Sequence, residues 1–402
     1  MKTYRGMYKM YFDMKGRQAA AEMAMSLHDS VSAIAPNFDV NGAPSFIVYC
    51  DEILHELCAI RNQNQLIDFL STSLPAMARR QFLRQAMIEE IHQTNEMENI
   101  HSTRKEIQDE ILVIENGRKG KRFDGMIRKY YLLAEKRMIP LDSCQDVRNL
   151  YDSFVLDEVV KENPQDTPDG IYFRKSPVSL VKREQVIHRG VYPETALNEA
   201  MEHALSFLND GDYDPLIRIA AFHYMFGYIH PFYNGNGRMT RFISSCRLAM
   251  ENVHLLVALR LSYVIKSHRT KYYEMFKTTN DKRNFGDITC FVIEFLRFIS
   301  EASGQVLDFL NEKRKLISHY GQVIDQLPFD NQAKRVLFIL AQVSVCESSS
   351  LNIAQLARAA DVSRYIAEKS MQELAQLCIS ARKGNSTLYR ADLEKLDSLD
   401  DT

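Results

Sequence analysis

The sequence has 402 residues and a mass of 46.5 kDa, a length that suggests two or three domains. Hydrophobic residues make up 46% and charged residues 25%, which is typical of a globular protein with a sizeable core. The formal net charge of -2 gives no general argument for binding nucleic acid or an anionic membrane. Seven cysteines stand singly, without CxxC pairs or zinc-like spacing, so we expect free thiols and a cytoplasmic protein. No signal peptide and no run of 18 apolar residues is visible, so no membrane segment is expected.

The N-terminal region, residues 1–115, is predicted to be helical. Gly and Pro are few in the whole chain (16 and 11), and apolar residues recur mostly at helical spacing, which predicts a mainly α fold. An apolar stripe predicts a helix over about 83–100; its members are Leu83, Met87, Ile88 and Ile91. The following segment, 116–137, is rich in Lys and Arg and is expected to be a solvated connector rather than a nucleic-acid patch.

The middle of the chain begins with a loop and an extended stretch. Residues 161–170 contain two prolines and a glycine among polar residues, which predicts a loop. A short extended stretch is expected over 171–189. A helix is then predicted from about 193 to 209.

Two further helices flank a short Gly-rich loop. The first begins at about 214 and is apolar nearly all round, so it should be buried. It must end near His230, because Pro231 disfavours helix at the residue before it. The second is predicted to begin at about Arg238, and Phe232 is expected to anchor the intervening loop in the core.

The loop between these helices favours polyphosphate binding. Gly235 and Gly237 permit backbone conformations in which several N–H groups face an anion, next to the positive N-terminus of the following helix. Arg238 and Arg241 are three residues apart and share one helix face, where they can grip phosphates. At the loop entrance, His230 can accept a proton from an incoming hydroxyl near pH 7.

The C-terminal part is predicted to contain helices over 333–343, 352–360 and 363–377 and strands over 378–382 and 386–390. This order resembles a winged helix. Between 328 and 390 there are eight Lys/Arg and five Asp/Glu, a net of +3, which is weak for DNA because neutralised phosphates dominate affinity. DNA binding through 328–390 and a protein-docking or dimerising role are therefore equal alternatives.

The Gly-rich loop resembles the motif of the Fic (Fido) family, His-x-Phe-x-Asp/Glu-Gly-Asn-Gly-Arg-x-x-Arg. Seven of its eight fixed positions match here: His230, Phe232, Gly235, Asn236, Gly237, Arg238 and Arg241. The eighth position, acidic in the family, is Asn234. Flanking segments are also similar, so the resemblance covers about 140–300. It implies a helical Fic core with a small β-hairpin flap.

From these observations together we predict a division of the chain. Its parts are an N-terminal helical region (1–115), a catalytic domain (116–305), a linker helix (306–327) and a winged-helix domain (328–402).

The activity that the resemblance implies is transfer of AMP from ATP to a Ser, Thr or Tyr hydroxyl of a target protein or of the chain itself. His230 would be the general base. Asn236 and the loop N–H groups around Gly235 and Gly237 would hold the α-phosphate, while Arg238 and Arg241 would hold the β- and γ-phosphates.

The same resemblance implies a target-binding flap. It would clamp a target segment as an added strand through Ile187, His188, Arg189 and Gly190.

Asn234 is where the sequence departs from the family. The acidic residue at this position holds Mg²⁺ between the α- and β-phosphates in the family. Asn234 keeps an oxygen ligand without the charge that Mg²⁺ prefers. We therefore expect weaker metal binding and a slow or altered enzyme.

Residues 94–99 resemble the inhibitory pattern of the family, Ser/Thr-x-x-x-Glu-Gly/Asn. Thr94 and Glu98 are four residues apart and share a helix face, and Asn99 completes the pattern. The resemblance implies that Glu98 lies against Arg241 and blocks productive placement of the γ-phosphate.

Two other functions remain open from the sequence. One is a winged-helix DNA-binding regulator with a weakly active or vestigial Fic domain. The other is a Fic enzyme that transfers a different phosphate-containing group. A bacterial origin is expected, and a homodimer is left open.

Overall fold

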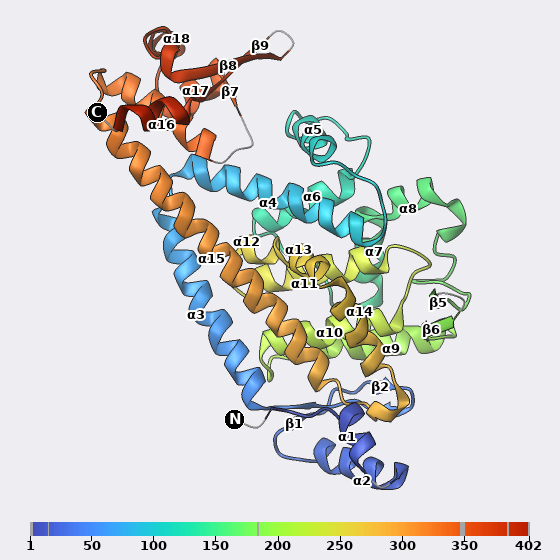
Figure 1. Cartoon of the computed structure of the whole chain (residues 1–402). Helices are drawn as coiled ribbons and strands as arrows, with labels where there is room; N and C mark the ends of the chain where they lie inside the picture. Colours follow the sequence, from blue (N-terminus) through green and yellow to red (C-terminus); the bar gives the residue numbers. More distant parts are fainter. Residues whose placement is uncertain (1–2, 15, 183–184, 346–349, 384–385, 401–402) are drawn as a thin grey trace. The chain divides into compact units, whose positions relative to one another are not determined.

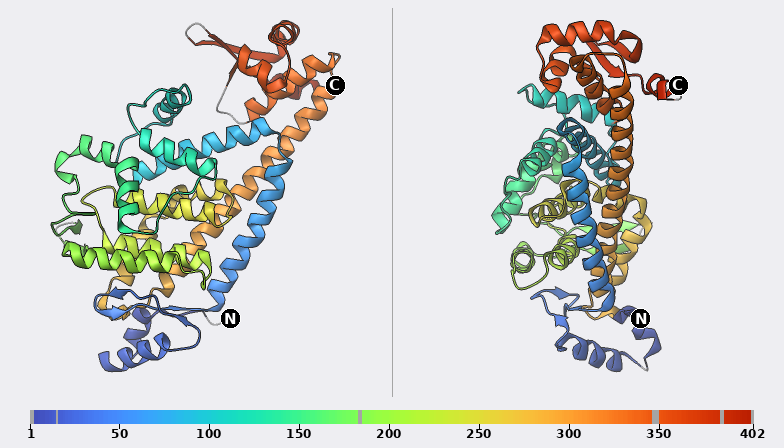
Figure 2. Two further views of the ribbon diagram at one scale, coloured as in Figure 1. Left: turned by 180° about the vertical axis from the view of Figure 1, so that it is seen from behind. Right: turned by 90° about the vertical axis from the view of Figure 1, so that its left-hand side faces the viewer.

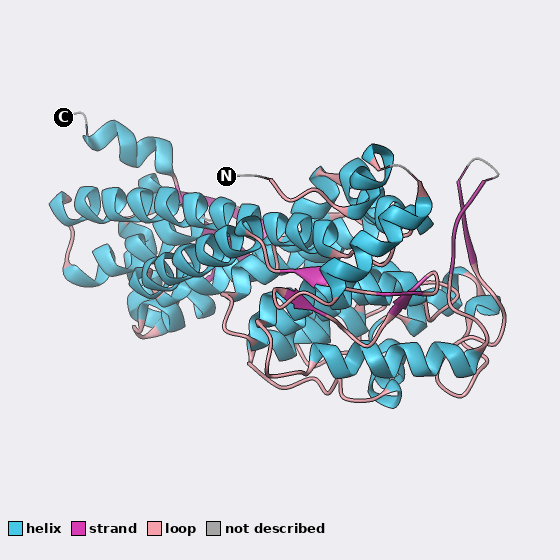
Figure 3. Cartoon of the chain, turned by 90° about the horizontal axis from the view of Figure 1, so that it is seen from below, coloured by secondary structure: helices cyan, strands magenta, loops and turns pink. Residues whose placement is uncertain are grey.

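The computed structural model describes residues 3–14, 16–182, 185–345, 350–383 and 386–400. The chain divides into two compact units, a first unit of 1–64 and 87–303 and a second unit of 65–86 and 304–402 (Figure 1). Helices dominate both units and the strands are short (Figure 3), so the prediction of a mainly α fold is confirmed. Three helices contribute residues to both units: α3 (Asp51–Ser73), α4 (Ala76–Met97) and α15 (Thr289–Gln326).

The sequence predicts helices throughout residues 1–115, but the first 50 residues also contain strands. Two helices, α1 (Met7–Asp13) and α2 (Arg17–His28), are followed by four two-residue strands: β1 (Ala33–Ile34), β2 (Asp39–Val40), β3 (Ala43–Pro44) and β4 (Ile47–Val48). β1 pairs with β4 and β2 with β3, both antiparallel. Asn41 and Gly42 connect β2 to β3 with φ of 53° and 78°, the conformation that a two-residue hairpin turn requires.

Half of the basic segment 116–137 is a helix, so its prediction as a solvated connector was wrong for residues 124–134, while residues 116–119 are an exposed connection. Helix α6 spans Asp124–Ala134 and buries Met126, Ile127, Tyr130 and Leu133. These residues recur at helical spacing, which the Lys and Arg residues around them obscured. The neighbouring elements are α5 (Arg104–Glu115), α7 (Cys144–Phe154), α8 (Leu156–Glu162) and the short 3-10 helix η1 (Pro164–Asp166).

Helix α10 (Pro215–Ile229) buries nearly all of its side chains, as its apolar sequence predicted. α10 packs against α9 (Glu194–Leu208) and α11 (Asn236–Met250) (Figure 2). Strands β5 (Ser179–Lys182) and β6 (Gln185–Arg189) form an antiparallel hairpin. The other elements are α12 (Leu255–Ala258), α13 (Leu261–Ser267), α14 (Arg269–Thr279) and η2 (Lys282–Asn284).

The second unit ends in helices and a small sheet. Its C-terminal elements are α16 (Asn331–Val345), β7 (Leu351–Asn352), α17 (Ile353–Ala360), α18 (Arg364–Glu373), η3 (Ala375–Leu377), β8 (Cys378–Lys383), β9 (Ser386–Ala391) and α19 (Leu393–Asp400). The sheet has the order β7-β9-β8. The winged-helix assignment itself stays a prediction, as do the domain limits; the proposed limit between 305 and 306 falls within α15.

Among the described residues, no helix is long and apolar enough to cross a membrane.

Candidate functional site

His230 ends helix α10 and turns the chain into the Gly-rich loop. Its backbone is left-handed (φ 52°, ψ 63°), a conformation that His tolerates better than most residues. The His230 N–H still donates to the Phe226 carbonyl at 3.0 Å, and Pro231 then prevents a further helical turn. The imidazole is thereby placed at the entrance of the loop, as predicted.

The loop is anchored from inside by Phe232 and Asn236. Phe232 is fully buried and stacks on Tyr151 with ring centroids 3.7 Å apart. The Asn236 amide holds the Phe232 backbone at both ends: its Oδ1 accepts from the Phe232 N–H at 2.9 Å, and its Nδ2 donates to the Phe232 carbonyl at 2.7 Å. Because the Asn236 side chain is used in this way, what it offers to a phosphate is its main-chain N–H.

Helix α11 begins at Asn236, two residues before the predicted start, after Gly235 at φ 82°. The first N–H groups of a helix lack partners within it, so those of Asn236, Gly237 and Arg238 are available at the loop. Together with the helix dipole they make this end of α11 favourable for an anion.

Arg238 is the most informative side chain of the site. It is 0% exposed, and none of its three guanidinium nitrogens has a hydrogen-bond partner among the described residues. The Glu162 carboxylate is 3.7 Å from its Nη2, which is an ion pair without a hydrogen bond. Burial lowers the pKa of Arg238, against the attraction of Glu162 and Glu98. A buried cation that lacks hydrogen bonds is costly, and a bound anion would satisfy it.

Arg241 is also buried, but unlike Arg238 its guanidinium donates hydrogen bonds to protein groups. Its Nε donates to the Thr94 hydroxyl at 2.8 Å, and its Nη2 donates to the Thr94 carbonyl at 3.0 Å and to Glu98 Oε1 at 2.8 Å. Burial by itself lowers the pKa of Arg241 and raises that of Glu98, but their mutual attraction outweighs burial and leaves the pKa of Arg241 raised and that of Glu98 lowered. The predicted contact between Glu98 and Arg241 is thus present.

Asn99 sets the position of Glu98. It follows the end of α4 with φ 59°, and the Ile100 N–H donates back to the Asn95 carbonyl at 2.9 Å, a helix C-cap for which Gly or Asn is favoured. Glu98 comes to rest on Gly237, where a Cβ atom would collide with its carboxylate. The absence of a side chain at 237 therefore makes room for Glu98.

His230 is neutral at pH 7 in this surrounding. Burial, followed by the positive potential of His188 and Arg174, lowers the pKa of His230 to about 4, although Glu98 acts to raise it. A neutral imidazole can accept a proton, so the side chain is in the state that a general base requires.

Arg174 is a residue of the site that sequence reasoning did not single out. It is fully buried and donates from Nε to the His230 carbonyl at 2.9 Å, from Nη1 to the Ser176 carbonyl at 2.8 Å and from Nη2 to the Val191 carbonyl at 2.8 Å. The Arg174 guanidinium thus connects the Gly-rich loop to Ser176, before strand β5, and to Val191, after strand β6. A single arginine in an irregular stretch gives no signal of this role in the sequence.

The hairpin β5–β6 carries three of the four predicted flap residues, and the fourth, Gly190, follows directly after β6. His188 Nε2 lies 2.6 Å from the Tyr228 carbonyl, while Arg189 is exposed. Ile187 lies in β6 at the bulge of the hairpin and has no register partner among the described residues; its side chain lies outside the described part of the chain. A Cβ atom on Gly190 would be 3.1 Å from the His230 Cβ, so the strand leaves the hairpin directly beside the imidazole.

Asn234 makes two side-chain hydrogen bonds. Its Oδ1 accepts from the Gly235 N–H at 2.6 Å, and its Nδ2 donates to Asp166 Oδ2 at 3.2 Å. Among the described residues, no group of three or more His, Cys, Asp or Glu could hold a metal alone. A cation at Asn234 would need ligands from a bound phosphate.

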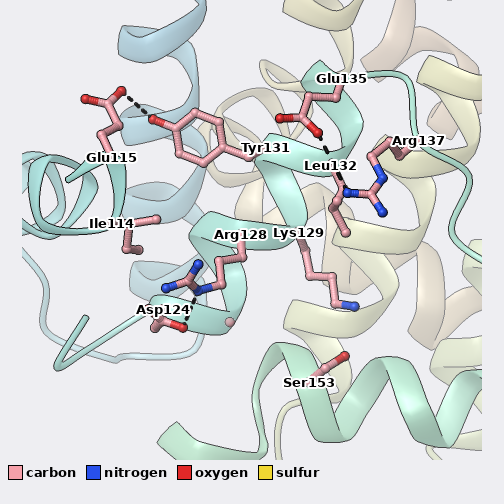
Figure 4. A pocket seen from close by; sticks show the side chains of 11 residues that line it. Ile114, Glu115, Asp124, Arg128, Lys129, Tyr131, Leu132, Glu135, Arg137 and Ser153 are labelled. Carbon is pink, nitrogen blue, oxygen red and sulfur yellow. Dashed lines mark hydrogen bonds and ion pairs between the residues drawn. The ribbon is translucent and has the colours of Figure 1, made fainter. Parts of the chain in front are cut away.

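A separate pocket lies between α5, α6 and α7 and contains none of the loop residues (Figure 4). Its polar side chains are largely paired with each other. Arg128 Nε is 2.7 Å from Asp124 and the Tyr131 hydroxyl donates to Glu115 at 2.7 Å.

Comparison with known proteins points to one family. The model of the Fic/DOC family matches residues 143–247, which include the whole Gly-rich loop. The protein adenylyltransferase Fic of Aedes aegypti is 31% identical over 143 residues, covering 34% of this chain and 26% of the relative. That of Drosophila virilis is 30% identical over 132 residues, covering 32% and 24%. The chain thus spans about a quarter of the length of these curated relatives.

Solved structures of Fic proteins are also similar. A Fic family protein from Desulfovibrio desulfuricans G20 aligns with a TM-score of 0.47 and 19% identity, over 83% of this chain and 95% of that one. Fic-1 from C. elegans aligns with a TM-score of 0.46 and 16% identity, over 65% and 74%.

Proposed function

We propose that this protein, whose residues 143–247 belong to the Fic/DOC family, transfers the AMP moiety of ATP to a hydroxyl side chain of a protein. The observation that carries the proposal is Arg238, a fully buried guanidinium at the N-terminus of a helix that has no hydrogen bond to any residue the structure describes. It calls for a strongly anionic ligand, and a neutral imidazole lies at the entrance of the same loop. The names of the curated relatives support a protein adenylyltransferase.

In the proposed reaction the oxygen of the target hydroxyl attacks the α-phosphorus of ATP. The bond between the α-phosphorus and the oxygen bridging to the β-phosphorus breaks, and pyrophosphate leaves with that electron pair. His230 takes the proton of the hydroxyl, a contribution of about 10²–10⁴-fold to the rate. The N–H groups at the start of α11 stabilise the negative charge on the α-phosphate, and Arg238 holds the following phosphates.

The segment after β6 supports a protein as the acceptor. Gly190 packs so closely against Arg174 and His230 that a Cβ atom there would collide with the Arg174 guanidinium, which places the end of the hairpin next to His230. An extended target segment pairing with the hairpin would bring its hydroxyl to the imidazole.

Mg²⁺ would supply charge neutralisation of the phosphates when bound. The residues of this chain that could contact it are Asn234 and its partner Asp166.

The contact between Glu98 and Arg241 is proposed to keep the enzyme inhibited. In the arrangement seen here, Nε and Nη2 of Arg241 donate to Thr94 and Glu98. A γ-phosphate that needs the same guanidinium must displace a carboxylate of the same charge. The enzyme would therefore be slow until Glu98 moves.

The test uses ATP labelled at either the α- or the γ-phosphorus. We expect label from the α-position, and not from the γ-position, to appear on protein incubated with the Glu98→Gly chain. Transfer of γ-label would instead identify a kinase-like reaction, and transfer of neither label would contradict the proposal.

A further inference from the structure

We propose that Asp166 supplies the carboxylate that the Gly-rich loop lacks at Asn234, so that the divalent cation accompanying the nucleotide is held by Asp166 and Asn234 together. The inference rests on the nucleotide-binding function proposed above. It assigns a metal-binding role to a residue outside the loop, 68 positions earlier in the chain.

The contact between Asn234 and Asp166 carries the assignment. Asn234 Nδ2 donates to Asp166 Oδ2 at 3.2 Å, so the carboxylate lies directly against the amide that replaces the usual acid. Asp166 is the last residue of η1, and its Oδ1 accepts from Asn163 at 3.1 Å. The loop backbone is fixed on the other side, because the Tyr151 hydroxyl donates to the Asn234 carbonyl at 3.1 Å.

The second, independent observation is the buried and unsatisfied guanidinium of Arg238 in the same place. Arg238 follows Asn234 by four residues, is 0% exposed and has no hydrogen bond among the described residues. It indicates that a polyphosphate, rather than protein groups alone, completes this site. Mg²⁺ is usually held by one or two carboxylates together with substrate phosphates and water, which is the ligand set that Asp166, Asn234 and a polyphosphate would provide.

Charge also favours this pairing. An amide at 234 beside a carboxylate at 166 carries the same single negative charge as one carboxylate at 234. Without a cation, the Asn234 amide can turn its NH₂ toward Asp166; two carboxylates in that contact would repel each other. Glu162 is another acidic side chain near this site, but it faces the Arg238 guanidinium at 3.7 Å, and no hydrogen bond joins it to Asn234 in the described part of the chain.

The experiment compares nucleotide affinity with and without metal in the full chain. All proteins carry Glu98→Gly, so that the carboxylate on Arg241 does not compete with the ligand. Binding of α,β-methylene-ATP, which cannot transfer AMP, is measured by calorimetry in Mn²⁺ and in EDTA. The ratio of the two dissociation constants gives the gain in affinity due to metal.

We expect Asp166→Asn to reduce this gain by about tenfold or more, the scale on which loss of a metal-supporting carboxylate acts. Asn234→Asp should increase it, and the double variant Asp166→Asn/Asn234→Asp should return it close to that of the parent. Asp157→Asn, which removes an exposed carboxylate from the neighbouring helix α8, is the matched control and should change nothing.

An unchanged metal-dependent gain in Asp166→Asn would overturn the inference while leaving the proposed function intact. Failure of the parent chain to bind the nucleotide in either Mn²⁺ or EDTA would instead contradict the proposed function. Failure of the double variant to recover would also count against the inference, because it would show that the carboxylate at 166 is not replaceable from 234.

Discussion

Two arginines on one face of α11 differ in a way that defines the state of the site. Arg241 donates three hydrogen bonds to Thr94 and Glu98, whereas Arg238 makes none with the described residues. The difference arises because Gly237, between them, leaves room for the Glu98 carboxylate. The site is thus prepared for an anion at Arg238 and already holds one at Arg241.

Glu98 should therefore limit the rate. We expect Glu98→Gly to raise self-modification by about tenfold or more, since a hydrogen bond to a charged group contributes about 1.5–3 kcal/mol. Glu98→Gln is the matched control: it keeps the size of the side chain but removes the charge, and should give an intermediate increase. Equal initial rates of all three proteins at saturating ATP would show that Glu98 does not act as a brake.

The low pKa of His230 predicts a pH profile. Because burial and nearby positive charge lower this pKa to about 4, the imidazole should remain a proton acceptor well below its ordinary pKa of 6.5. In the Glu98→Gly protein, which lacks a group that raises the pKa of His230, initial rates should show an acid limb with a midpoint below pH 6.5. A midpoint at pH 7 or above would mean that His230 is not the base, or that it is far more exposed to water than the structure shows.

At the scale of elements, helix α4 is tied to the first unit by a buried carboxyl group. Glu90 lies two turns before Glu98 and is fully buried. The Tyr130 hydroxyl of α6 donates to it at 3.1 Å, and the hydroxyl and N–H of Ser262 in α13 donate at 2.5 and 3.1 Å. Burial raises the pKa of Glu90 to about 7, against the effect of these hydrogen bonds.

The raised pKa makes stability depend on pH. In the unfolded chain Glu90 ionises near 4.5, whereas in the folded chain it keeps its proton up to about pH 7. The free energy of unfolding should therefore fall as pH rises from about 5 to 7, by up to ~3 kcal/mol from this group. Glu90→Gln should remove this part of the pH dependence in urea unfolding, and Glu199→Gln, an exposed residue of α9, should not. Parallel pH dependences of wild type and Glu90→Gln would contradict the assigned pKa.

The sequence predicts a structural feature when residues close in the chain determine it, and fails when the determining contact is distant in the chain. The end of α10 at His230 and the αL residue Asn99 follow from neighbouring residues, so they could be predicted or fitted to a motif. The burial of α6 was missed because its apolar positions stand among basic residues. The roles of Arg174 and Asp166 depend on segments 56 and 68 residues away in the chain, and no local pattern reveals such contacts.

For the whole molecule, the charges in the C-terminal part of the second unit determine whether the chain can bind DNA. The cations of α18 are paired along the helix: Arg364 with Glu368 at 2.8 Å and Lys369 with Glu373 at 3.8 Å. These carboxylates would oppose a phosphate backbone. We therefore expect the full chain to bind DNA with a Kd no tighter than about micromolar at physiological salt, the range of non-specific binding. Nanomolar, sequence-selective binding that is lost on Arg364→Ala would favour a DNA-binding regulator instead.

The mass of the intact protein after incubation with ATP and Mg²⁺ tests the proposed reaction most directly. For the Glu98→Gly chain we predict the gain of one or more AMP units. The same chain with His230→Asn, a substitution that tolerates the left-handed backbone at 230, should gain none. No added mass on the Glu98→Gly chain, or the addition of phosphate without the nucleoside, would contradict the account.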